Sequence, residues 1–447
     1  MANVLLLMSD EHNPLVSSVH GRPQVRTPNM ERLAQSGAVY RNTYCTSPLC
    51  LPSRSSFMCG KWVHQLQTYS NCNVNLNPAH PAYGAVLAQQ GVHTTLIGKT
   101  DVHTAAGNLG FSEITLPADR ELPGDTNHRR NPLAIRQGAA GRADGFGPRE
   151  NAFSGDLKRV DAALEWLRKT APGLDRPWML TVNISNPHFP QYVTQDLWDL
   201  YPNGGDLPTH GPECASAGHP YARDLRAHFE TDRFTEDQVR GLRRGYLGCV
   251  TFVDRQLGRL MDALEETGQQ DDTAVIYTSD HGDMLGKFGM WWKCSLYEDS
   301  ARVPCIAAGP GFERGQTVQT PVTLLDVQAA LFRAVDARRP ADWAGSPLQD
   351  IPQNDPERVV FSEYHGHGAR ASAYMVRQGK WKYIHCVAAP NLLFDLEEDP
   401  DELNDLAESR PEIATRLETE LRNICDPNAE NDRAEAFIQR QLEGILP

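Results

Sequence analysis

The chain of 447 residues carries 57 acidic and 43 basic side chains, a formal net charge of −14. Hydrophobic residues make up 40% of the chain and charged residues 22%, which is typical of a soluble globular protein with a large core and room for a smaller second domain. No apolar run approaches the roughly 20 residues that span a bilayer. So negative a chain is a poor binder of nucleic acid or anionic membranes, and we expect neither as a partner. An anionic substrate would need a local cationic pocket.

The amino-terminal sequence MANVLLLMSDEH lacks a basic segment, a long apolar stretch and a small-residue cleavage site. We therefore expect a cytoplasmic protein, or a mature form whose signal has been removed. The 10 cysteines form no CxxC pair, and the spacing of Cys45, Cys50, Cys59 and Cys72 is unlike that of a zinc finger or a redox motif. For all of them except Cys50 we expect small buried side chains in a reducing compartment.

Four short apolar runs are each followed by polar residues: Val4 to Met8 by Asp10, Thr94 to Ile97 by Lys99, Met179 to Ile184 by His188, and Ala274 to Thr278 by Asp280 and His281. Such runs suit strands that are buried on both faces. Apolar stripes from Leu157 to Leu167 and from Val239 to Leu264 predict helices between them. The alternation indicates an α/β fold, in which ligands bind beyond the carboxyl ends of the strands. The polar residues are expected to gather there.

The rest of the chain predicts loops and a smaller second unit. Stretches near 110–150 and 201–220 read as loops that shape the pocket, and 339–357 reads as a linker. Strands at 358–365, 372–386 and 391–396 and helices near 411–423 and 432–446 follow. We therefore expect a catalytic domain over 1–350 and a C-terminal α+β subdomain with a small antiparallel sheet over 351–447. Apolar residues in the tail would dock on the same subunit or on a neighbour, which leaves a homo-oligomer open: Ala434, Phe437, Ile438, Leu442 and Ile445.

The stretch CLPSRSSFMCGK at residues 50–61 carries the strongest chemical signal. Pro52 suits the first turn of a helix, where its missing N–H costs nothing. We therefore expect Cys50 at a helix N-terminus, whose free N–H groups and dipole attract anions. Arg54 shares a helix face with Cys50, and a guanidinium beside a nucleophile suits a sulfuryl or phosphoryl group. A buried cysteine and a surface arginine at an ordinary helix start account for these features equally well.

CLPSR resembles the C-x-P-S-R signature of type I sulfatases, in which the cysteine becomes formylglycine, although Cys59 stands where the family usually has threonine. Six more blocks resemble the same family in sequence order: NVLLLMSDEH, GVHTTLIGKT, SNPHFP, YTSDHGD, KCSLYEDSARVP, and GKWKYIHC with LLFDLEEDPDELNDLA. The resemblance covers nearly the whole chain. It implies the fold of the alkaline-phosphatase superfamily, with a large mixed, mostly parallel central sheet flanked by helices. It also implies an arylsulfatase-like hydrolase of sulfate esters.

The resemblance implies one divalent metal ion. It makes Asp10, Asp280 and His281 ligands together with the modified Cys50, and Glu11, where the family often has aspartate, a weaker candidate. Hard carboxylate oxygens suit Ca²⁺, Mg²⁺ or Mn²⁺, and a histidine nitrogen is compatible with Mn²⁺. We expect Ca²⁺, with Mn²⁺ and Mg²⁺ as alternatives. Outside matching blocks, each aspartate after a strand would be read as a turn or helix cap.

The resemblance also assigns the cationic side chains of the pocket. Lys99 and Lys293 would bind the sulfate oxygens, and His188, with Lys293, would support the departing alkoxide as hydrogen-bond donor or general acid. His103 is a less secure candidate, because many relatives place a histidine two residues after the lysine, where this chain has Asp101.

In the implied mechanism, one hydroxyl of hydrated formylglycine is activated by the metal, attacks sulfur and releases the alcohol. The second hydroxyl is then deprotonated, and collapse to the aldehyde expels sulfate. The substrate is a small anionic sulfate ester, and the formylglycine-generating machinery is a partner during maturation. The alcohol half is not specified; Asn71 and Asn73 would line its pocket or belong to loop structure.

Three alternatives remain at this point. The same pocket could hydrolyse phosphonate monoesters or phosphodiesters, whose anionic centres have a similar shape and charge. The chain could instead be a non-catalytic binding protein whose Cys50 is never modified. A zinc phosphatase with an ordinary hydroxyl nucleophile is less favoured, because CLPSR would then be accidental.

Overall fold

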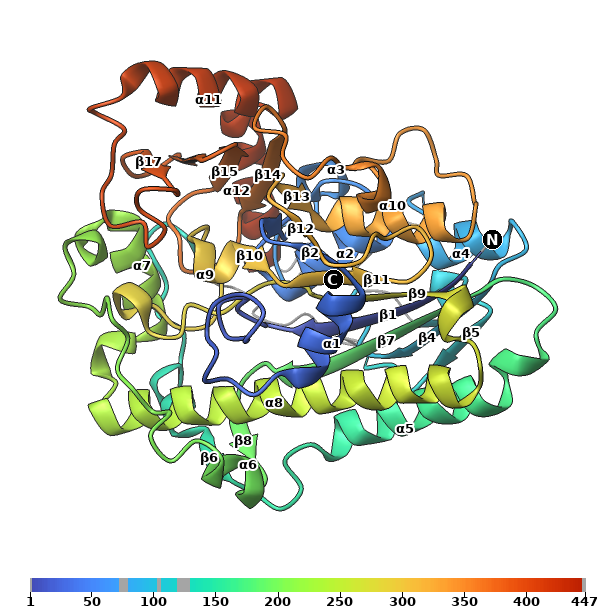
Figure 1. The fold of residues 1–447 in the computed structure, drawn as a ribbon. Coiled ribbons are helices and arrows are strands. Elements are labelled where there is room, and N and C mark those ends of the chain that lie inside the picture. The colour runs from blue at the N-terminus through green and yellow to red at the C-terminus, as the bar shows by residue number, and fades with distance from the viewer. Residues whose placement is uncertain (1, 72–78, 103–105, 119–128, 444–447) are drawn as a thin grey trace.

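The computed structural model describes residues 2–71, 79–102, 106–118 and 129–443. An eight-stranded sheet lies at the centre, in the order β12-β2-β11-β9-β1-β7-β4-β5 (Figure 1). Its strands are β1 (Asn3–Asp10), β2 (Gly37–Tyr40), β4 (His93–Gly98), β5 (Glu113–Thr115), β7 (Trp178–Pro187), β9 (Thr273–Ser279), β11 (Cys305–Ala308) and β12 (Gln316–Val318). Strands β9, β1, β7, β4 and β5 run parallel, whereas β11 is antiparallel to both β9 and β2. The predicted mixed, mostly parallel sheet is confirmed.

The register of the parallel strands brings their carboxyl ends to one edge of the sheet. Ser9 of β1 pairs with Ser279 of β9, and Asp10 pairs with Pro187 of β7. In the same way, Gly98 of β4 pairs with Asn183 of β7. The apolar residues that precede these ends are fully buried, which explains the near-continuous hydrophobic runs in the sequence.

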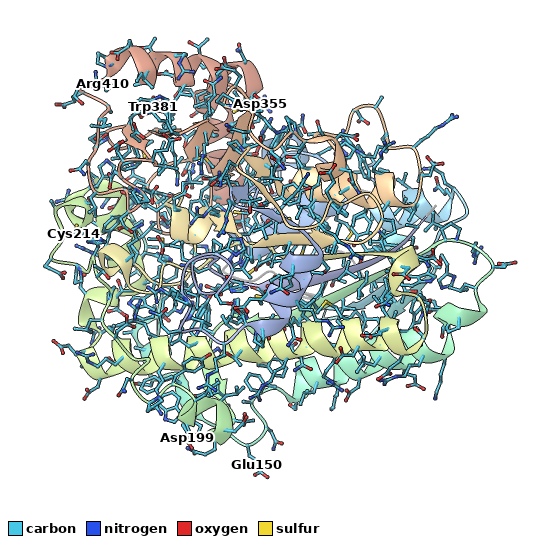
Figure 2. All side chains as sticks on the ribbon, viewed as in Figure 1. Glu150, Asp199, Cys214, Asp355, Trp381 and Arg410 are labelled. Atoms are coloured by element: carbon cyan, nitrogen blue, oxygen red, sulfur yellow. The ribbon has the colours of Figure 1, made fainter. Side chains whose placement is uncertain are left out.

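Helices cover both faces of the sheet (Figure 1). One face packs against α1 (Pro28–Ser36), α5 (Ser154–Lys169) and α8 (Glu236–Glu266), and the other against α2 (Cys50–Cys59), α4 (Tyr83–Ala88) and α10 (Leu324–Ala334). Figure 2 shows how densely side chains fill the space between these layers. Both predicted helical stripes are present, but Leu157, in the first turn of α5, is 38% exposed and lies outside the buried stripe. No helix among the described residues is long and apolar enough to cross a membrane.

The region predicted as a loop near 110–150 contains two short strands. One is β5, at the edge of the central sheet, and the other is β6 (Phe146–Pro148), which pairs in parallel with β8 (Gln191–Val193). The prediction of continuous loop was therefore wrong at these positions. The pairing of β6 with β8 fixes the 140–148 segment beside the chain that follows β7.

A separate antiparallel sheet follows, made of β14 (Val359–Tyr364), β15 (Ala373–Gln378), β16 (Trp381–Cys386) and β17 (Leu392–Asp395). Helix α11 (Pro411–Ile424) packs Leu417 and Leu421 against it. Lys382 of this sheet is fully buried, and its ammonium lies 2.9 Å from Glu298 of α9 (Glu298–Ala301) and 2.8 Å from Glu402. The predicted small antiparallel sheet is confirmed, while the division of the chain at residue 350 stays a prediction.

The last helix, α12 (Pro427–Leu442), begins five residues before the predicted start at 432, because the Asp426 side chain caps it and Pro427 occupies its first turn. Ala434, Phe437 and Ile438 pack against Tyr69 of the same chain. These apolar tail residues therefore dock within the subunit. Ile445 lies outside the described residues.

Candidate active site

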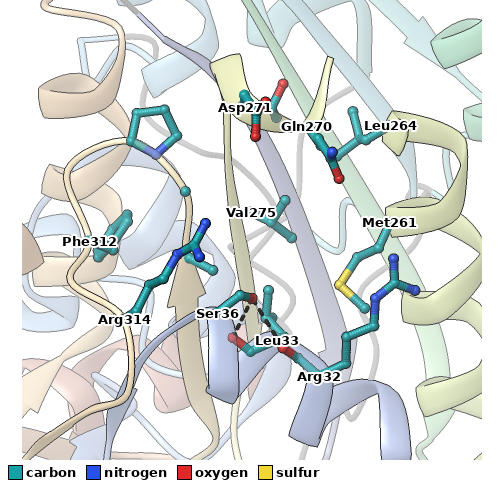
Figure 3. A pocket seen from close by; sticks show the side chains of 14 residues that line it. Arg32, Leu33, Ser36, Met261, Leu264, Gln270, Asp271, Val275, Phe312 and Arg314 are labelled. Atoms are coloured by element: carbon teal, nitrogen blue, oxygen red, sulfur yellow. Dashed lines mark hydrogen bonds between the residues drawn. The ribbon is translucent and has the colours of Figure 1, made fainter. Parts of the chain in front are cut away.

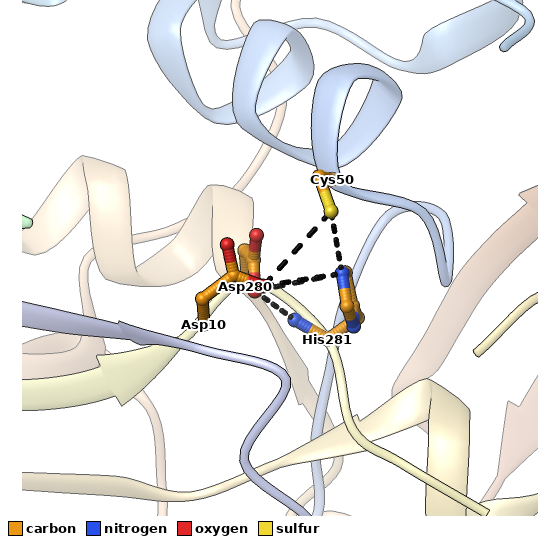
Figure 4. A group of neighbouring side chains, drawn as sticks. All are labelled: Asp10, Cys50, Asp280 and His281. Atoms are coloured by element: carbon orange, nitrogen blue, oxygen red, sulfur yellow. Dashed lines mark hydrogen bonds and ion pairs between the residues drawn. The ribbon is translucent and has the colours of Figure 1, made fainter. Parts of the chain in front are cut away.

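Four side chains converge at the carboxyl edge of the sheet (Figure 4). Asp10 ends β1, Asp280 and His281 follow β9, and Cys50 begins α2. The Cys50 sulfur lies 3.2 Å from His281 Nε2 and 3.9 Å from Asp10 Oδ1, and His281 Nε2 lies 3.7 Å from Asp280 Oδ1. All four residues are buried. The structure thus brings together the residues that the sequence proposed as nucleophile and metal ligands.

The start of α2 differs from the predicted open anion site. The Leu51 N–H donates to Asn71 Oδ1 at 3.1 Å, Pro52 has no N–H, and the Ser53 N–H donates to the Leu49 carbonyl at 3.0 Å. The first turn therefore offers fewer free N–H groups than the sequence suggested, because two of its donors are bonded within the protein. An anion at Cys50 must be held mainly by side-chain cations.

Arg54 faces the two aspartates rather than an open pocket. Its Nε donates to Asp280 Oδ2 at 2.7 Å, and its Nη2 donates to Asp10 Oδ2 at 3.3 Å. Burial opposes the charge, but the two carboxylates raise the pKa of the Arg54 guanidinium above its usual value. A planar fork of donors orients both carboxylates at once. The predicted sharing of a face by Cys50 and Arg54 holds, but the guanidinium positions the acidic pair.

The donor set fits a divalent cation. One ligand atom each from Asp10, Cys50, Asp280 and His281 lies within 4.8 Å of all the others. Burial alone would raise the pKa of Asp10, yet Lys99 and the neighbouring cations hold it well below its usual value. Burial likewise opposes the imidazolium, but Asp280 and the Cys50 thiolate raise the pKa of His281 to about 9. Carboxylate oxygens and one imidazole around a common point are the ligands that hard divalent ions accept.

Cations gather around the sulfur of Cys50. The Lys99 ammonium binds Asp10 Oδ2 and lies 3.3 Å from Asp101. Burial and Asp10 oppose ionisation of the Cys50 thiol, but Lys293, Lys99 and His281 together lower its pKa. This electropositive surrounding is what an anionic ester group at the same position requires.

Lys293, His188 and Glu11 form a second group beside the first. The Lys293 ammonium donates to His188 Nε2 at 2.6 Å and to Glu11 Oε2 at 3.0 Å. Glu11 belongs to a second group of potential metal ligands, with Asp10 and His188, and not to the cluster that contains Cys50. In the structure, the carboxylate of Glu11 binds the ammonium of Lys293.

The imidazole of His188 is held in one orientation. Its Nδ1 lies 2.7 Å from the Phe189 carbonyl oxygen, so Nδ1 carries the proton and Nε2 accepts from Lys293. Burial and Lys293 lower the pKa of His188 to about 4. In this arrangement His188 Nε2 accepts a hydrogen bond from Lys293, and the role as donor or general acid that the sequence suggested for His188 stays a prediction.

Two candidate residues, His103 and Asn73, lie outside the described residues. Asn71, by contrast, is buried beside Cys50 through its bond to the Leu51 N–H. Its role in the structure is to complete the first turn of α2.

The sequence missed a buried aspartate next to the candidate ligand cluster. Asp283 Oδ1 accepts from the N–H groups of Leu285 and Trp292, at 2.8 and 3.1 Å, and so fixes the turn that carries Lys293. Burial and the nearby Glu11 raise the pKa of Asp283 well above its usual value. The only signal in the sequence was its place inside the YTSDHGD block.

Four of the non-glycine residues with a positive φ lie at this site. Glu11, Asp101, Trp292 and Cys294 have φ angles of 66°, 47°, 63° and 77°, in the left-handed region that side chains other than glycine seldom adopt. Such strain persists only where the surrounding structure enforces it, and it clusters at functional sites. Each of these residues adjoins a candidate ligand or pocket lysine. No residue type in the sequence signalled this conformation.

A surface hollow of about 340 Å³ lies elsewhere on the sheet (Figure 3). Thr273 and Val275 line it at the amino end of β9, whereas Asp280 follows the carboxyl end of that strand. Seven residues of strand separate the two ends by roughly 20 Å. The hollow is therefore not part of the site around Cys50.

Comparisons with known proteins agree with this site. The family model described as sulfatase matches residues 2–337, three-quarters of the chain. The chain belongs to the sulfatase family. A second model, described as N-sulphoglucosamine sulphohydrolase, C-terminal, matches residues 286–426. This sulfatase is a sulfuric ester hydrolase, and the family generally uses a metal ion and formylglycine.

Relatives match this sulfatase over most of its length. A choline-sulfatase of Rhizobium meliloti (strain 1021) is 33% identical over 91% of this chain and 82% of the relative. Arylsulfatase K of Danio rerio is 29% identical over 95% of this chain and 84% of the relative. The alternative of a non-catalytic binding protein is therefore not supported.

Solved structures share the fold of this sulfatase. The phosphonate monoester hydrolase of Agrobacterium radiobacter has a TM-score of 0.77 at 22% identity, and each chain is covered to 95%. A protein in complex with its substrate D-glucosamine-2-N,6-O-disulfate has a TM-score of 0.76 at 20% identity, with 97% of this chain and 99% of that chain covered. These likenesses confirm the alkaline-phosphatase-like architecture predicted from the sequence.

Proposed function

We propose that this sulfatase cleaves sulfate esters with a formylglycine made from Cys50 and a Ca²⁺ ion held by Asp10, Asp280 and His281. The observation that carries the proposal is the position of the Cys50 sulfur, 3.2 Å from His281 Nε2, in a buried cluster of metal-type ligands. Mn²⁺ and Mg²⁺ are the alternative ions. Formylglycine hydrate supplies two hydroxyls on one carbon, and the ion lowers the pKa of the attacking hydroxyl.

The other side chains around Cys50 have different roles in the proposed reaction. Arg54 holds Asp10 and Asp280 in the orientation that the ligand set needs. Lys99 and Lys293 lie close enough to Cys50 to lower the pKa of its thiol, so their charges reach a sulfuryl group bound there. Fixed cations stabilise the charge that develops on the sulfate oxygens in the transition state.

The proton for the departing alcohol comes from Lys293 in this proposal. Its ammonium is held between His188 Nε2 and Glu11 Oε2. Burial opposes its charge, but the thiolate of unmodified Cys50, Glu11 and Asp10 raise the pKa of Lys293, so the side chain is an ammonium when the substrate binds. His188 orients this ammonium by accepting one of its hydrogen bonds. A positioned acid matters most when the departing oxygen is a strong base.

The names of the relatives specify different alcohols, choline in one case and an aryl group in the other. We therefore propose a sulfate ester as the reacting group and do not infer the alcohol from these names. We also propose that the protein acts in a reducing, cytoplasmic compartment after maturation by the formylglycine-generating machinery. No disulfide joins the described cysteines, which supports a reducing compartment.

The test of the nucleophile is Cys50→Ser, assayed for alcohol release from an aryl sulfate. A serine hydroxyl at this position can attack sulfur but has no second hydroxyl on its carbon to expel the sulfate. We expect about one alcohol released per site, followed by arrest, with the sulfuryl group retained on the serine by mass. Cys59→Ser, at another buried cysteine of the same helix, is the control and should turn over normally. Sustained turnover by Cys50→Ser would refute the formylglycine proposal.

The test of the ion is chelation followed by addition of Ca²⁺, Mn²⁺ or Mg²⁺ singly. The peptide that contains Cys50 is analysed by mass in the same preparation. We expect Ca²⁺ to restore turnover best and the peptide to carry an aldehyde in place of the thiol. Full activity after exhaustive chelation, or a fully active sample with only unmodified thiol, would contradict the proposal.

A further inference from the structure

The last residues of β7, just before His188, are bound by a buried carboxylate of α5. Asp156 lies in the first turn of this helix, and 1% of its side chain is exposed. Its Oδ1 accepts from the Ser185 N–H at 2.9 Å, and its Oδ2 accepts from the Asn186 N–H at 2.8 Å and from Asn186 Nδ2 at 2.7 Å. Hydrogen bonds to an ionised acceptor are stronger than those between neutral groups, so one side chain fixes two consecutive residues of the strand end.

The same strand end determines where the His188 imidazole lies. The Ser185 carbonyl accepts from the His188 N–H at 3.0 Å and closes a turn over residues 185–188. The imidazole then reaches the Lys293 ammonium, from which its Nε2 accepts at 2.6 Å. Three successive hydrogen bonds therefore connect Asp156 with Lys293, by way of Ser185 and His188.

Arg159, one turn further along α5, completes this arrangement. Its Nη1 donates to Asp156 Oδ1 at 2.7 Å and to Ser185 Oγ at 2.8 Å. The same side chain lies against Gly98 at the end of β4, where an added Cβ would lie 2.9 Å from Arg159 Cδ. Gly98 directly precedes Lys99 in the chain. The pair of Asp156 and Arg159 therefore contacts the ends of both β7 and β4.

Helix α5 holds Asp156 in place because the helix itself is packed into the core. Its residues Val160, Leu164 and Leu167 are buried in the hydrophobic cluster that joins α5 to the central sheet. The first turn of a helix is also a favourable position for an acidic side chain, since the helix dipole is positive there. A carboxylate anchored in this way can impose one position on the short turn at 185–188.

We infer that Asp156 is a positioning residue of the reaction, which holds the turn that places the His188 imidazole against the Lys293 ammonium. The inference rests on the proposed sulfate-ester hydrolysis. A proton reaches the departing oxygen only from a donor at hydrogen-bond distance, and a displacement of about 1 Å can lower the rate about 100-fold. Asp156 does not touch the substrate, so its effect on turnover passes through His188.

The test is a double-mutant cycle of Asp156→Asn and His188→Ala, with modified, metal-loaded enzyme and an aryl sulfate whose phenol is a poor leaving group. Asparagine keeps the shape of the side chain but places an NH2 donor where a carboxylate oxygen accepted an N–H. We expect Asp156→Asn alone to lower kcat/KM about 10- to 100-fold, mainly through kcat. In the His188→Ala background the same change should cost less than about threefold, because no imidazole remains to be misplaced.

Asp161→Asn is the matched control, because its carboxylate lies on the same helix but binds Arg259 of α8 at 2.6 Å. It should leave kcat/KM unchanged in both backgrounds. If circular dichroism showed that Asp156→Asn is unfolded, the same cycle with Arg159→Gln would decide the question, since this change removes the guanidinium bonded to Asp156. Its loss of kcat/KM should likewise disappear in His188→Ala.

Equal losses with and without the His188 imidazole would show a purely structural role and overturn the inference. Unchanged kcat/KM in folded Asp156→Asn would also overturn it, and the proposed function would stand in both cases. Absence of any sulfate release by modified, metal-loaded wild type would instead reject the proposed function, on which the inference rests.

Discussion

Removal of the His188 imidazole and of the Lys293 ammonium should have different consequences, because in the proposed mechanism only the ammonium supplies a proton to the departing alcohol. In the structure Lys293 has two acceptors, His188 Nε2 at 2.6 Å and Glu11 Oε2 at 3.0 Å. His188→Ala removes one acceptor and leaves the ammonium on Glu11. Lys293→Met removes the acid itself and leaves the buried Glu11 carboxylate without its cation.

The size of each effect follows from these bonds. A hydrogen bond to a charged group contributes about 1.5–3 kcal/mol, and about 1.4 kcal/mol is a factor of ten in rate. His188→Ala should therefore lower kcat/KM about 10- to 150-fold on a sulfate ester with a poor leaving group. Loss of a positioned acid typically costs about 10²–10⁴-fold, so Lys293→Met should be more damaging on that substrate.

The assay is kcat/KM for a series of aryl sulfates whose phenols span a wide range of pKa. We expect the dependence on leaving-group pKa to steepen strongly in Lys293→Met and weakly in His188→Ala, since the first loses the proton donor and the second its orientation. Circular dichroism checks that both variants are folded. If the dependence on leaving-group pKa were steeper in His188→Ala than in Lys293→Met, this reasoning would be refuted. The His188 imidazole would then be the general acid.

Three further predictions concern the metal site and the stability of the fold. Asp280→Asn should lower bound metal and turnover together with an unchanged circular dichroism spectrum, whereas full metal occupancy with normal turnover would remove Asp280 from the ligands. Lys382→Met should lower the free energy of unfolding by about 3–5 kcal/mol, because its fully buried ammonium pairs with two glutamates, while the exposed Lys169→Met should change it by less than about 0.5 kcal/mol in the same urea titration. Burial opposes ionisation of Glu363, but the two histidines bonded to it lower its pKa from 4.5 to about 2. Its stabilisation should therefore be present above pH 4.5 and lost as the pH falls toward 2, so the unfolding free energies of wild type and Glu363→Gln should converge over that window.

The positions of Asp10, Asp280 and His281 could be predicted from the sequence because parallel strands impose a common edge. Each follows a run of apolar residues, and the register of the sheet brings these ends together without further information. The start of α2 at Cys50 could also be predicted from the sequence, since Pro52 marks a first turn.

Contacts between side chains that are distant in the sequence were harder to predict from the sequence. The bond from Leu51 to Asn71 closes the helix end that looked open, and it depends on how the 66–71 segment packs. The direction of the Arg54 guanidinium depends on two carboxylates from two different strands. The protonated nitrogen of His188 is set by the carbonyl of the next residue, which is a matter of local backbone geometry.

The depth of the CLPSR segment has a consequence for when the protein matures. Every residue of α2, Cys50 included, is buried, and Cys50 itself is 1% exposed. An enzyme that oxidises this thiol must hold the segment in its own cleft, which the folded chain does not permit. The conversion to formylglycine that we propose for Cys50 would therefore have to precede closure of α2 over the sheet, while the chain is still extended. Folded protein made without the modifying machinery would stay inactive when that machinery is added later, until it is unfolded and refolded in its presence.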